Sequence, residues 1–225
     1  KGPTSFDVVQ TVRRALKVKK AGHTGTLDPM ATGVLAICLG DATRIVQVLT
    51  DGDKAYDATV KLGVTTDTLD AEGKTLLTRA VPTLTRDALE AVFAKFRGPQ
   101  LQTPPMYSAI RKDGKRLYEL ARAGEEVERE ARPVTVHTLT LNDFSSDELK
   151  LSVRCSKGFF VRTLAADIGE ALGCGAHLTA LRRTQSGPFS IARAVPLAEL
   201  VEQGVAAAAG KLATLDESLA FLPEV

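Results

Sequence analysis

Gly22-His-Thr-Gly-Thr-Leu-Asp-Pro-Met-Ala-Thr-Gly33 is the stretch of the sequence that differs most from an ordinary core or surface segment. Its twelve residues include three glycines, three threonines, one histidine, one aspartate and one proline. Glycine permits backbone conformations that other residues avoid and lets a ligand approach the main chain closely. Proline restricts the preceding residue, Asp28, to an extended or turn conformation. We therefore expect a rigid loop that presents a carboxylate.

Two side chains of this loop could serve either structure or chemistry. Asp28 could simply cap its turn by accepting hydrogen bonds from the backbone. His23 could be an ordinary hydrogen-bonded loop histidine. Taken singly, each residue favours the structural interpretation, so a functional role requires support from elsewhere in the chain.

The segments outside the loop predict both helices and strands. Apolar residues recur at helical spacing in some stretches and alternate with polar residues in others. In the alternating stretch from Tyr56 to Leu62, Tyr56 is expected on the inward face, where it could also be a plain core residue. The pattern predicts a mixed α+β fold built around a β-sheet. Helices are expected at residues 5–17, 41–49, 85–98, 161–172 and 197–209, and strands at 34–39, 56–62, on both sides of a turn at Asn142-Asp143, and at 178–182.

Composition excludes several classes of protein. With 44% hydrophobic and 25% charged residues among 225, the chain as a whole is neither disordered nor collagen-like. Its three cysteines form no metal-binding or disulfide motif, which predicts reduced core thiols in a cytosolic protein. The apolar runs are too short to cross a bilayer, and no charged-then-apolar leader opens the chain. We expect a soluble protein without a recognisable export signal.

Basic residues cluster locally although the net charge is only +2, from 29 Lys and Arg against 27 Asp and Glu. These clusters could be solvated surface, but clusters that converged in space would bind phosphates. One of them falls within residues 102–132, where Pro104-Pro105 and two glycines predict a long excursion from the core. The clusters are Arg13-Arg14 with Lys17, Lys19 and Lys20; Arg111-Lys112 with Lys115-Arg116; and Arg182-Arg183.

The stretch from Gly22 to Leu35 closely resembles the signature of the bacterial TruB family of tRNA pseudouridine synthases. Further motifs resemble the family in the same order over roughly residues 2–190. They are Lys54-Ala-Tyr56, Asp67-Thr-Leu-Asp70-Ala-Glu-Gly73, Pro104-Pro-Met-Tyr-Ser-Ala109, Gly158-Phe-Phe-Val-Arg162 and Gly175-Ala-His-Leu-Thr-Ala-Leu-Arg-Arg183.

The resemblance implies a pseudouridine synthase fold, a largely antiparallel sheet with flanking helices. The catalytic domain would span residues 1–190 and carry an RNA-gripping insertion at about 102–132. Residues 191–225 would form a C-terminal helical segment leading to an RNA-binding module that the sequence does not contain.

The resemblance also implies a reaction: isomerisation of uridine to pseudouridine at position 55 in the T loop of tRNA. The enzyme would be a cytoplasmic monomer that binds the T arm of tRNA and uses no cofactor, metal ion or membrane. Uracil must be detached at N1, turned and rejoined through C5, so the site needs a carboxylate in a water-poor pocket. The matching carboxylate is Asp28, and the sequence leaves open whether it attacks the base or the sugar.

The family motifs imply roles for the residues around Asp28. Arg162 would pair with Asp28 and keep it ionised, although a structural ion pair elsewhere is the alternative. Tyr56 would stack on the target base. His23 would fill the space left when that nucleotide is flipped out of the RNA.

Further positions would contact substrate less directly. Phe160 and Leu181 would line the base pocket, where Phe160 lacks the hydroxyl of the tyrosine found in relatives. Asp70 would orient its neighbours. The insertion would meet RNA phosphates through Arg111, Lys112, Lys115 and Arg116.

Two alternative functions would be compatible with the same RNA-binding surface. A non-catalytic RNA-binding module would have no need of a buried carboxylate beside an arginine and an aromatic ring. A related synthase acting on another RNA would share the chemistry and differ in its insertion.

Overall fold

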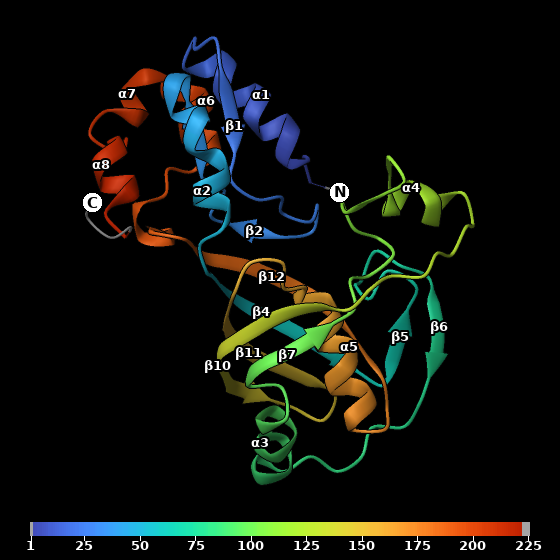
Figure 1. Cartoon of the computed structure of the whole chain (residues 1–225). Coiled ribbons are helices and arrows are strands. Elements are labelled where there is room, and N and C mark those ends of the chain that lie inside the picture. Colours follow the sequence, from blue (N-terminus) through green and yellow to red (C-terminus); the bar gives the residue numbers. More distant parts are fainter. Residues whose placement is uncertain (1, 222–225) are drawn as a thin grey trace. The chain divides into compact units, whose positions relative to one another are not determined.

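The computed structural model describes residues 2–221 and divides into two compact units. The first unit contains the chain up to Tyr56 and from Arg182 onward, and the second contains residues 57–181 (Figure 1). The expected α+β class is confirmed, with a largely antiparallel sheet and flanking helices. Across residues 2–221, none of the helices combines the length and apolar character needed to span a membrane.

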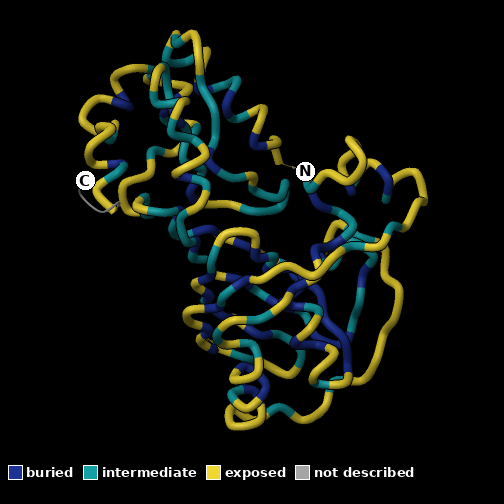
Figure 2. Tube along the Cα trace, in the orientation of Figure 1, coloured by how far each residue is buried: buried dark blue, intermediate teal, exposed yellow. Residues whose placement is uncertain are grey.

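A sheet forms the core of the second unit. β10 (Arg132–Phe144) pairs antiparallel with β11 (Glu148–Cys155) and with β7 (Gly98–Gln102). The sheet continues from β11 through β4 (Lys54–Leu62) to β12 (Ala176–Ser186). Every second residue of β11, from Leu149 to Cys155, is buried, as alternation predicts (Figure 2).

Two expectations about these strands were wrong. The turn of the β10–β11 hairpin does not lie at Asn142-Asp143; β10 runs on to Phe144, and a register shift between Leu141 and Asp143 accommodates the polar pair within the strand. Pro99, which we expected to follow a helix end, lies inside β7. A proline is tolerated there because, among the described residues, β7 is an edge strand with β10 as its one neighbour.

Two predicted helices cover this sheet. α3 (Arg86–Ala94) begins after Thr85, whose hydroxyl accepts the Ala88 amide at 3.2 Å, and it buries Leu89, Val92 and Phe93. α3 contacts β10 and α5 (Val161–Ala171). Gly169 of α5 lies so close to the start of β12 that a Cβ would be 2.2 Å from the Ala176 nitrogen.

The rest of the second unit consists of two smaller segments. β5 (Val64–Thr66) and β6 (Thr75–Thr78) form a hairpin around residues 67–73, called the acidic turn because they include Asp67, Asp70 and Glu72. The predicted insertion contains the two-residue strands β8 (Arg111–Lys112) and β9 (Lys115–Arg116), then α4 (Leu117–Arg122). Leu117 and Leu120 anchor α4 by their burial.

Helices dominate the first unit. α1 (Ser5–Ala15) has a capping box, in which the Thr4 hydroxyl and the Asp7 carboxylate each accept the other residue's backbone amide. Val12 packs with Leu200 from the C-terminal helices. The remaining elements are β1 (Ala21–His23), β2 (Thr32–Gly33), β3 (Ile37–Leu39), η1 (Gly40–Ile45), α2 (Val46–Thr50), β13 (Phe189–Ser190), η2 (Ile191–Arg193), α6 (Leu197–Gln203), α7 (Val205–Ala208) and α8 (Leu215–Leu219).

Some boundaries in the first unit differ from the predictions. Phe6, which shares the helical spacing of the buried Val9 and Val12, is nevertheless 65% exposed near the start of α1. The strand expected at 34–39 is limited to β3, and the helix expected at 41–49 begins as the 3-10 turn η1. Gly204, with φ of 58°, divides the helix expected at 197–209 into α6 and α7. The last four residues of the expected C-terminal segment, 222–225, lie outside the described residues.

Candidate functional site

The segment that contains Asp28, residues 24–36, connects two paired strands of the first unit and is called the Asp28 loop. β1 and β3 pair antiparallel from Ala21 with Leu39 to His23 with Ile37, which fixes the two ends of the loop. Within the loop, the Ala31 amide donates to the Asp28 carbonyl at 2.8 Å. Pro29 follows Asp28 at the position that turns of this kind favour for proline. The half-buried Asp28 therefore sits at the start of a closed turn, as the sequence predicts.

Ser5 fastens the loop to the start of α1. Its hydroxyl accepts the Leu27 amide at 2.9 Å and donates to the Leu27 carbonyl at 3.3 Å, while Ser5 itself is 5% exposed. The sequence predicts Ser5 only as the first residue of a helix, and no local pattern indicates this contact with Leu27. Leu27 directly precedes Asp28, so this bond helps to fix the main chain beside the carboxylate.

The surroundings of His23 favour the neutral form of its imidazole ring. Its Nδ1 accepts the Gly25 amide at 3.3 Å, which places the ring proton on Nε2. Burial lowers the pKa of His23, and the positive charge of Arg183 lowers it further. A neutral, half-buried ring suits the expected stacking role.

Arg162 and Asp70 form a buried ion pair in the second unit. Their closest side-chain atoms, Nη1 and Oδ2, are 3.5 Å apart, and the two residues are 4% and 5% exposed. Asp70 Oδ1 also accepts the Thr68 hydroxyl at 2.6 Å and the Glu72 amide at 3.0 Å. An ion pair of Arg162 with a residue other than Asp28 is the alternative that the sequence left open, and Asp70 supplies such a partner. The pairing of Arg162 with Asp28 stays a prediction.

Main-chain carbonyls also contact Arg162. It donates to Thr68 at 3.0 Å in the acidic turn and to Tyr107 at 2.7 Å at the start of the insertion. The guanidinium thus joins α5 to two other segments. The sequence could not reveal these carbonyl contacts, because any residue type supplies the same acceptor.

Phe160 lies at the residue before α5, where Gln102 of β7 holds its main chain. The Gln102 side chain accepts the Phe160 amide at 2.8 Å and donates to the Phe160 carbonyl at 3.1 Å. Leu181 is buried on β12, and Tyr56 is half-buried on β4. The structure therefore places His23, Asp28 and Tyr56 in the first unit, and Asp70, Phe160, Arg162, Leu181 and the insertion in the second.

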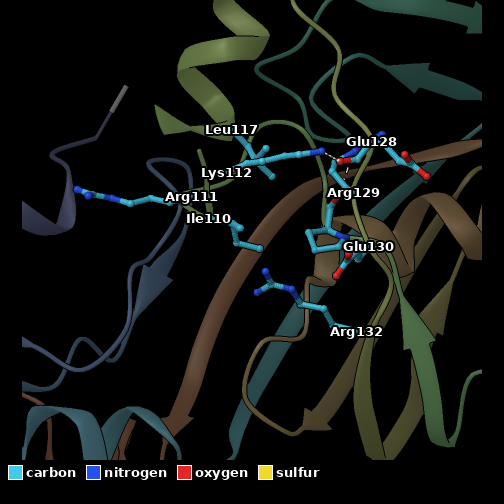
Figure 3. Close-up of a pocket in the computed structure, with 9 residues that line it drawn as sticks. Ile110, Arg111, Lys112, Leu117, Glu128, Arg129, Glu130 and Arg132 are labelled. Carbon is cyan, nitrogen blue, oxygen red and sulfur yellow. Dashed lines mark hydrogen bonds between the residues drawn. The ribbon is translucent and has the colours of Figure 1, made fainter. Parts of the chain in front are cut away.

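Some of the basic residues of the insertion, among them Arg111 and Lys112, line a cavity of about 220 Å³ (Figure 3). Arg111 and Lys112 extend in opposite directions, and the Lys112 ammonium donates to the Glu128 carbonyl at 2.6 Å. On the next strand, Arg116 lies 5.9 Å from the centre of the Tyr118 ring. The cavity is lined by Arg111, Lys112, Arg129 and Arg132, by Glu128 and Glu130, and by Pro104, Ile110 and Leu117.

Four cationic and two acidic residues thus line this cavity. Lys115 and Arg116 are exposed on β9, so they are accessible to a polyanion. Residues 2–221 contain no cluster of three or more His, Cys, Asp or Glu side chains that could bind a metal ion.

Two family models together match nearly the whole chain. Residues 13–161 match the N-terminal domain of TruB family pseudouridylate synthase, and residues 162–220 match the C-terminal domain of tRNA pseudouridylate synthase B.

Named relatives are similar over most of the chain. The tRNA pseudouridine synthase B of Azoarcus sp. (strain BH72) is 54% identical over 224 residues, which cover 100% of this chain and 74% of the relative. The enzyme of that name from Pseudomonas putida (strain F1) is 56% identical over 88% of this chain and 65% of the relative.

Solved structures also resemble the chain. A Cbf5-Nop10-Gar1 complex contains a chain with 32% identity and a TM-score of 0.70, matched over 89% of this chain and 51% of that one. An H/ACA RNP bound to a substrate RNA containing 2'-deoxyuridine gives 27% identity and a TM-score of 0.68, over 96% and 55%. The present chain therefore spans about half the length of these solved chains.

Proposed function

The chain belongs to the TruB family of pseudouridine synthases, and on that premise we propose that it isomerises uridine to pseudouridine at position 55 in the T loop of tRNA. Asp28 is the proposed catalytic carboxylate. The observation that carries the proposal is the Asp28 loop: it lies within the region matched by the family model, and its turn presents a half-buried carboxylate. The proposal extends to a monomer that acts on the T arm in the cytoplasm.

The reaction balances within the substrate. The bond between N1 of uracil and C1′ of the ribose breaks, and a bond between C5 and C1′ replaces it. A proton leaves C5, and N1 ends with a proton. The protein must stabilise charge during the bond exchange, hold the free base while it turns, and help to remove the C5 proton.

Asp28 supplies the negative charge or the nucleophile for the first step. The proposal assigns Arg162 the task of keeping Asp28 ionised when substrate excludes water, since an unpaired carboxylate in such a place would take up a proton. The Arg162 guanidinium is already ordered by Asp70 and by the carbonyls of Thr68 and Tyr107, which supports a fixed orientation.

Tyr56 would stack on the turning uracil and assist removal of the C5 proton. Stacking of a base on an aromatic ring contributes roughly 1–3 kcal/mol, enough to retain a detached base. His23, neutral at physiological pH, would fill the gap left by the flipped nucleotide, with Phe160 and Leu181 lining the base pocket. Arg111, Lys112, Lys115 and Arg116 of the insertion would contact phosphates.

An unmodified tRNA transcript tests the proposal. The wild-type protein is expected to convert one uridine, at position 55 of the T loop, as mapped by mass spectrometry or by chemical labelling of pseudouridine. Asp28→Asn is nearly isosteric and removes the charge, so it should abolish conversion while tRNA binding stays within about tenfold.

Asp41→Asn is the matched control, because Asp41 is exposed in the same unit and has no assigned role. Substantial turnover by Asp28→Asn would remove Asp28 from the mechanism. Binding without any conversion by the wild-type protein would instead favour an RNA-binding module.

A further inference from the structure

Arg183 is a buried charged residue to which the proposed mechanism assigns no step. It lies near the end of β12 and is only 2% exposed, which makes it the bulkiest fully buried side chain of the described residues. Arginine is rarely buried without a specific set of partners, because removal of its charge from water is costly. Its partners therefore indicate what it does.

The guanidinium of Arg183 binds both arms of the Asp28 loop. Nη2 donates to the Gly25 carbonyl at 3.1 Å, and Nη1 lies 3.4 Å from the Thr26 carbonyl, on the arm that leads into Asp28. Nε donates to the Val34 carbonyl at 2.7 Å, on the arm that leaves the turn. One planar group therefore spans the loop from three residues before Asp28 to six residues after it.

The main chain of Arg183 holds the second arm as well. Its carbonyl accepts the Val34 amide at 2.8 Å, and the end of β12 pairs in parallel with β2, Arg183 opposite Gly33. Gly33 has a φ of 99°, and a Cβ there would lie 2.1 Å from the Arg183 carbonyl oxygen. The loop and the strand are thus packed with no room for a side chain between them.

The chemistry of the group explains why arginine is suited to this place. A guanidinium offers five N–H donors in fixed directions, whereas a lysine offers one compact ammonium on a flexible stem. The carbonyls of Gly25 and Val34 point at the guanidinium from two separated segments, and buried carbonyls need donors. A lysine of similar length could serve one arm but not both in this geometry.

We propose that Arg183 is a positioning residue for the reaction: it clamps the two arms of the loop so that Asp28 is held in its reactive position before RNA binds. This inference rests on the proposed function of Asp28. Arg183 acts through the loop and does not itself contact the uridine. Preorganisation of this kind affects the chemical step more than substrate binding.

Arg183→Lys and Arg183→Ala test the clamp, with Arg193→Ala as a matched control at an exposed arginine of the same unit. Steady-state pseudouridine formation should show kcat reduced at least about tenfold in Arg183→Lys and further in Arg183→Ala, with KM for tRNA within about threefold. Arg193→Ala should match the wild type. Millimolar guanidinium should partly restore kcat in Arg183→Ala, and equal concentrations of urea should not.

Amide hydrogen exchange provides a readout independent of catalysis. The Ala31 amide closes the turn at Asp28, and it should exchange faster in Arg183→Lys, whereas amides buried in β11 should keep their protection. If Asp28→Asn stayed active, the proposed function would fail, yet faster exchange at Ala31 would still demonstrate the clamp. An unchanged kcat, an effect on KM alone, or unchanged exchange at Ala31 in folded Arg183→Lys would overturn the inference.

Discussion

His23 illustrates how one half-buried ring makes the free energy of unfolding depend on pH. Burial and the nearby charge of Arg183 lower its pKa in the folded protein below the usual 6.5. Near pH 6.5 the His23 imidazole takes up a proton in the unfolded chain but not in the folded one. His23 therefore contributes stability that is present above that pH and is lost as the pH falls towards the lower pKa of the folded state. We expect His23→Asn to lose less stability than the wild type between about pH 7.5 and 5.5.

Urea denaturation at several pH values measures this difference. His137→Asn, at an exposed histidine of β10, is the matched control for the loss of one imidazole. Equal pH dependence in His23→Asn and the wild type would contradict the assignment of a lowered pKa to His23.

At the residue scale, the sequence indicates the chemically distinctive side chains but not the residues that hold them in place through hydrogen bonds. Ser5, Gln102 and Arg183 bind partners 22, 58 and 149 residues away, and no local pattern shows such a pairing. Arg183 was grouped with Arg182 as a basic cluster. Strand alternation offered a signal: neighbouring residues of a strand face opposite sides, so Leu181 and Arg183 share the buried face while Arg182 is exposed.

The ion pair between Asp70 and Arg162 joins elements that lie far apart in the sequence. Through it and the two carbonyl contacts, α5 is tied to the acidic turn and to the start of the insertion. Removal of one partner from a buried pair leaves an uncompensated charge and typically costs about 3 kcal/mol or more. We therefore expect Asp70→Asn to lower the free energy of unfolding by about 3 kcal/mol in chemical denaturation.

Asp113→Asn provides the comparison for that measurement. Asp113 is exposed and has a φ of 51°, which asparagine tolerates, so its replacement should change stability by less than about 0.5 kcal/mol. Equal and small effects of both substitutions would mean that the Asp70 carboxylate does not compensate the Arg162 charge.

At the element scale, the best predictions were helices in which spacing and capping agree. Thr85 and the buried stripe of α3 specify its start and its inner face. α5 has a buried stripe too, but it begins after Phe160 without a side-chain cap. Prediction failed where the same polar pair can mark either a turn or a bulge and only the neighbouring strand decides which one forms. Asn142-Asp143 is a bulge and not a turn, because β11 offers pairing partners as far as Leu149 opposite Phe144.

For the molecule as a whole, the charge total explains little of RNA binding. A net charge of +2 produces a weak overall field, so attraction for a polyanion must come from local clusters such as that of the insertion. Each phosphate neutralised by such a cluster adds about 0.7 to 0.9 to the slope of log K against log salt. The number of phosphate contacts proposed for the insertion can therefore be measured without a structure of the complex.

Simultaneous replacement of Lys112, Lys115 and Arg116 by alanine should reduce that slope by about 2 for binding of a tRNA T-arm hairpin. The reduction should be smaller than three full contacts, because Lys112 is already engaged by the Glu128 carbonyl and must exchange that partner for a phosphate. Binding titrations from low to moderate salt measure the slope. Replacement of Lys74, Lys95 and Lys211, which are exposed elsewhere, removes the same charge and should leave the slope nearly unchanged, since the net field contributes little. If both triple variants shifted the slope equally, RNA attraction would depend on total charge, and the insertion would have no special part in gripping the substrate.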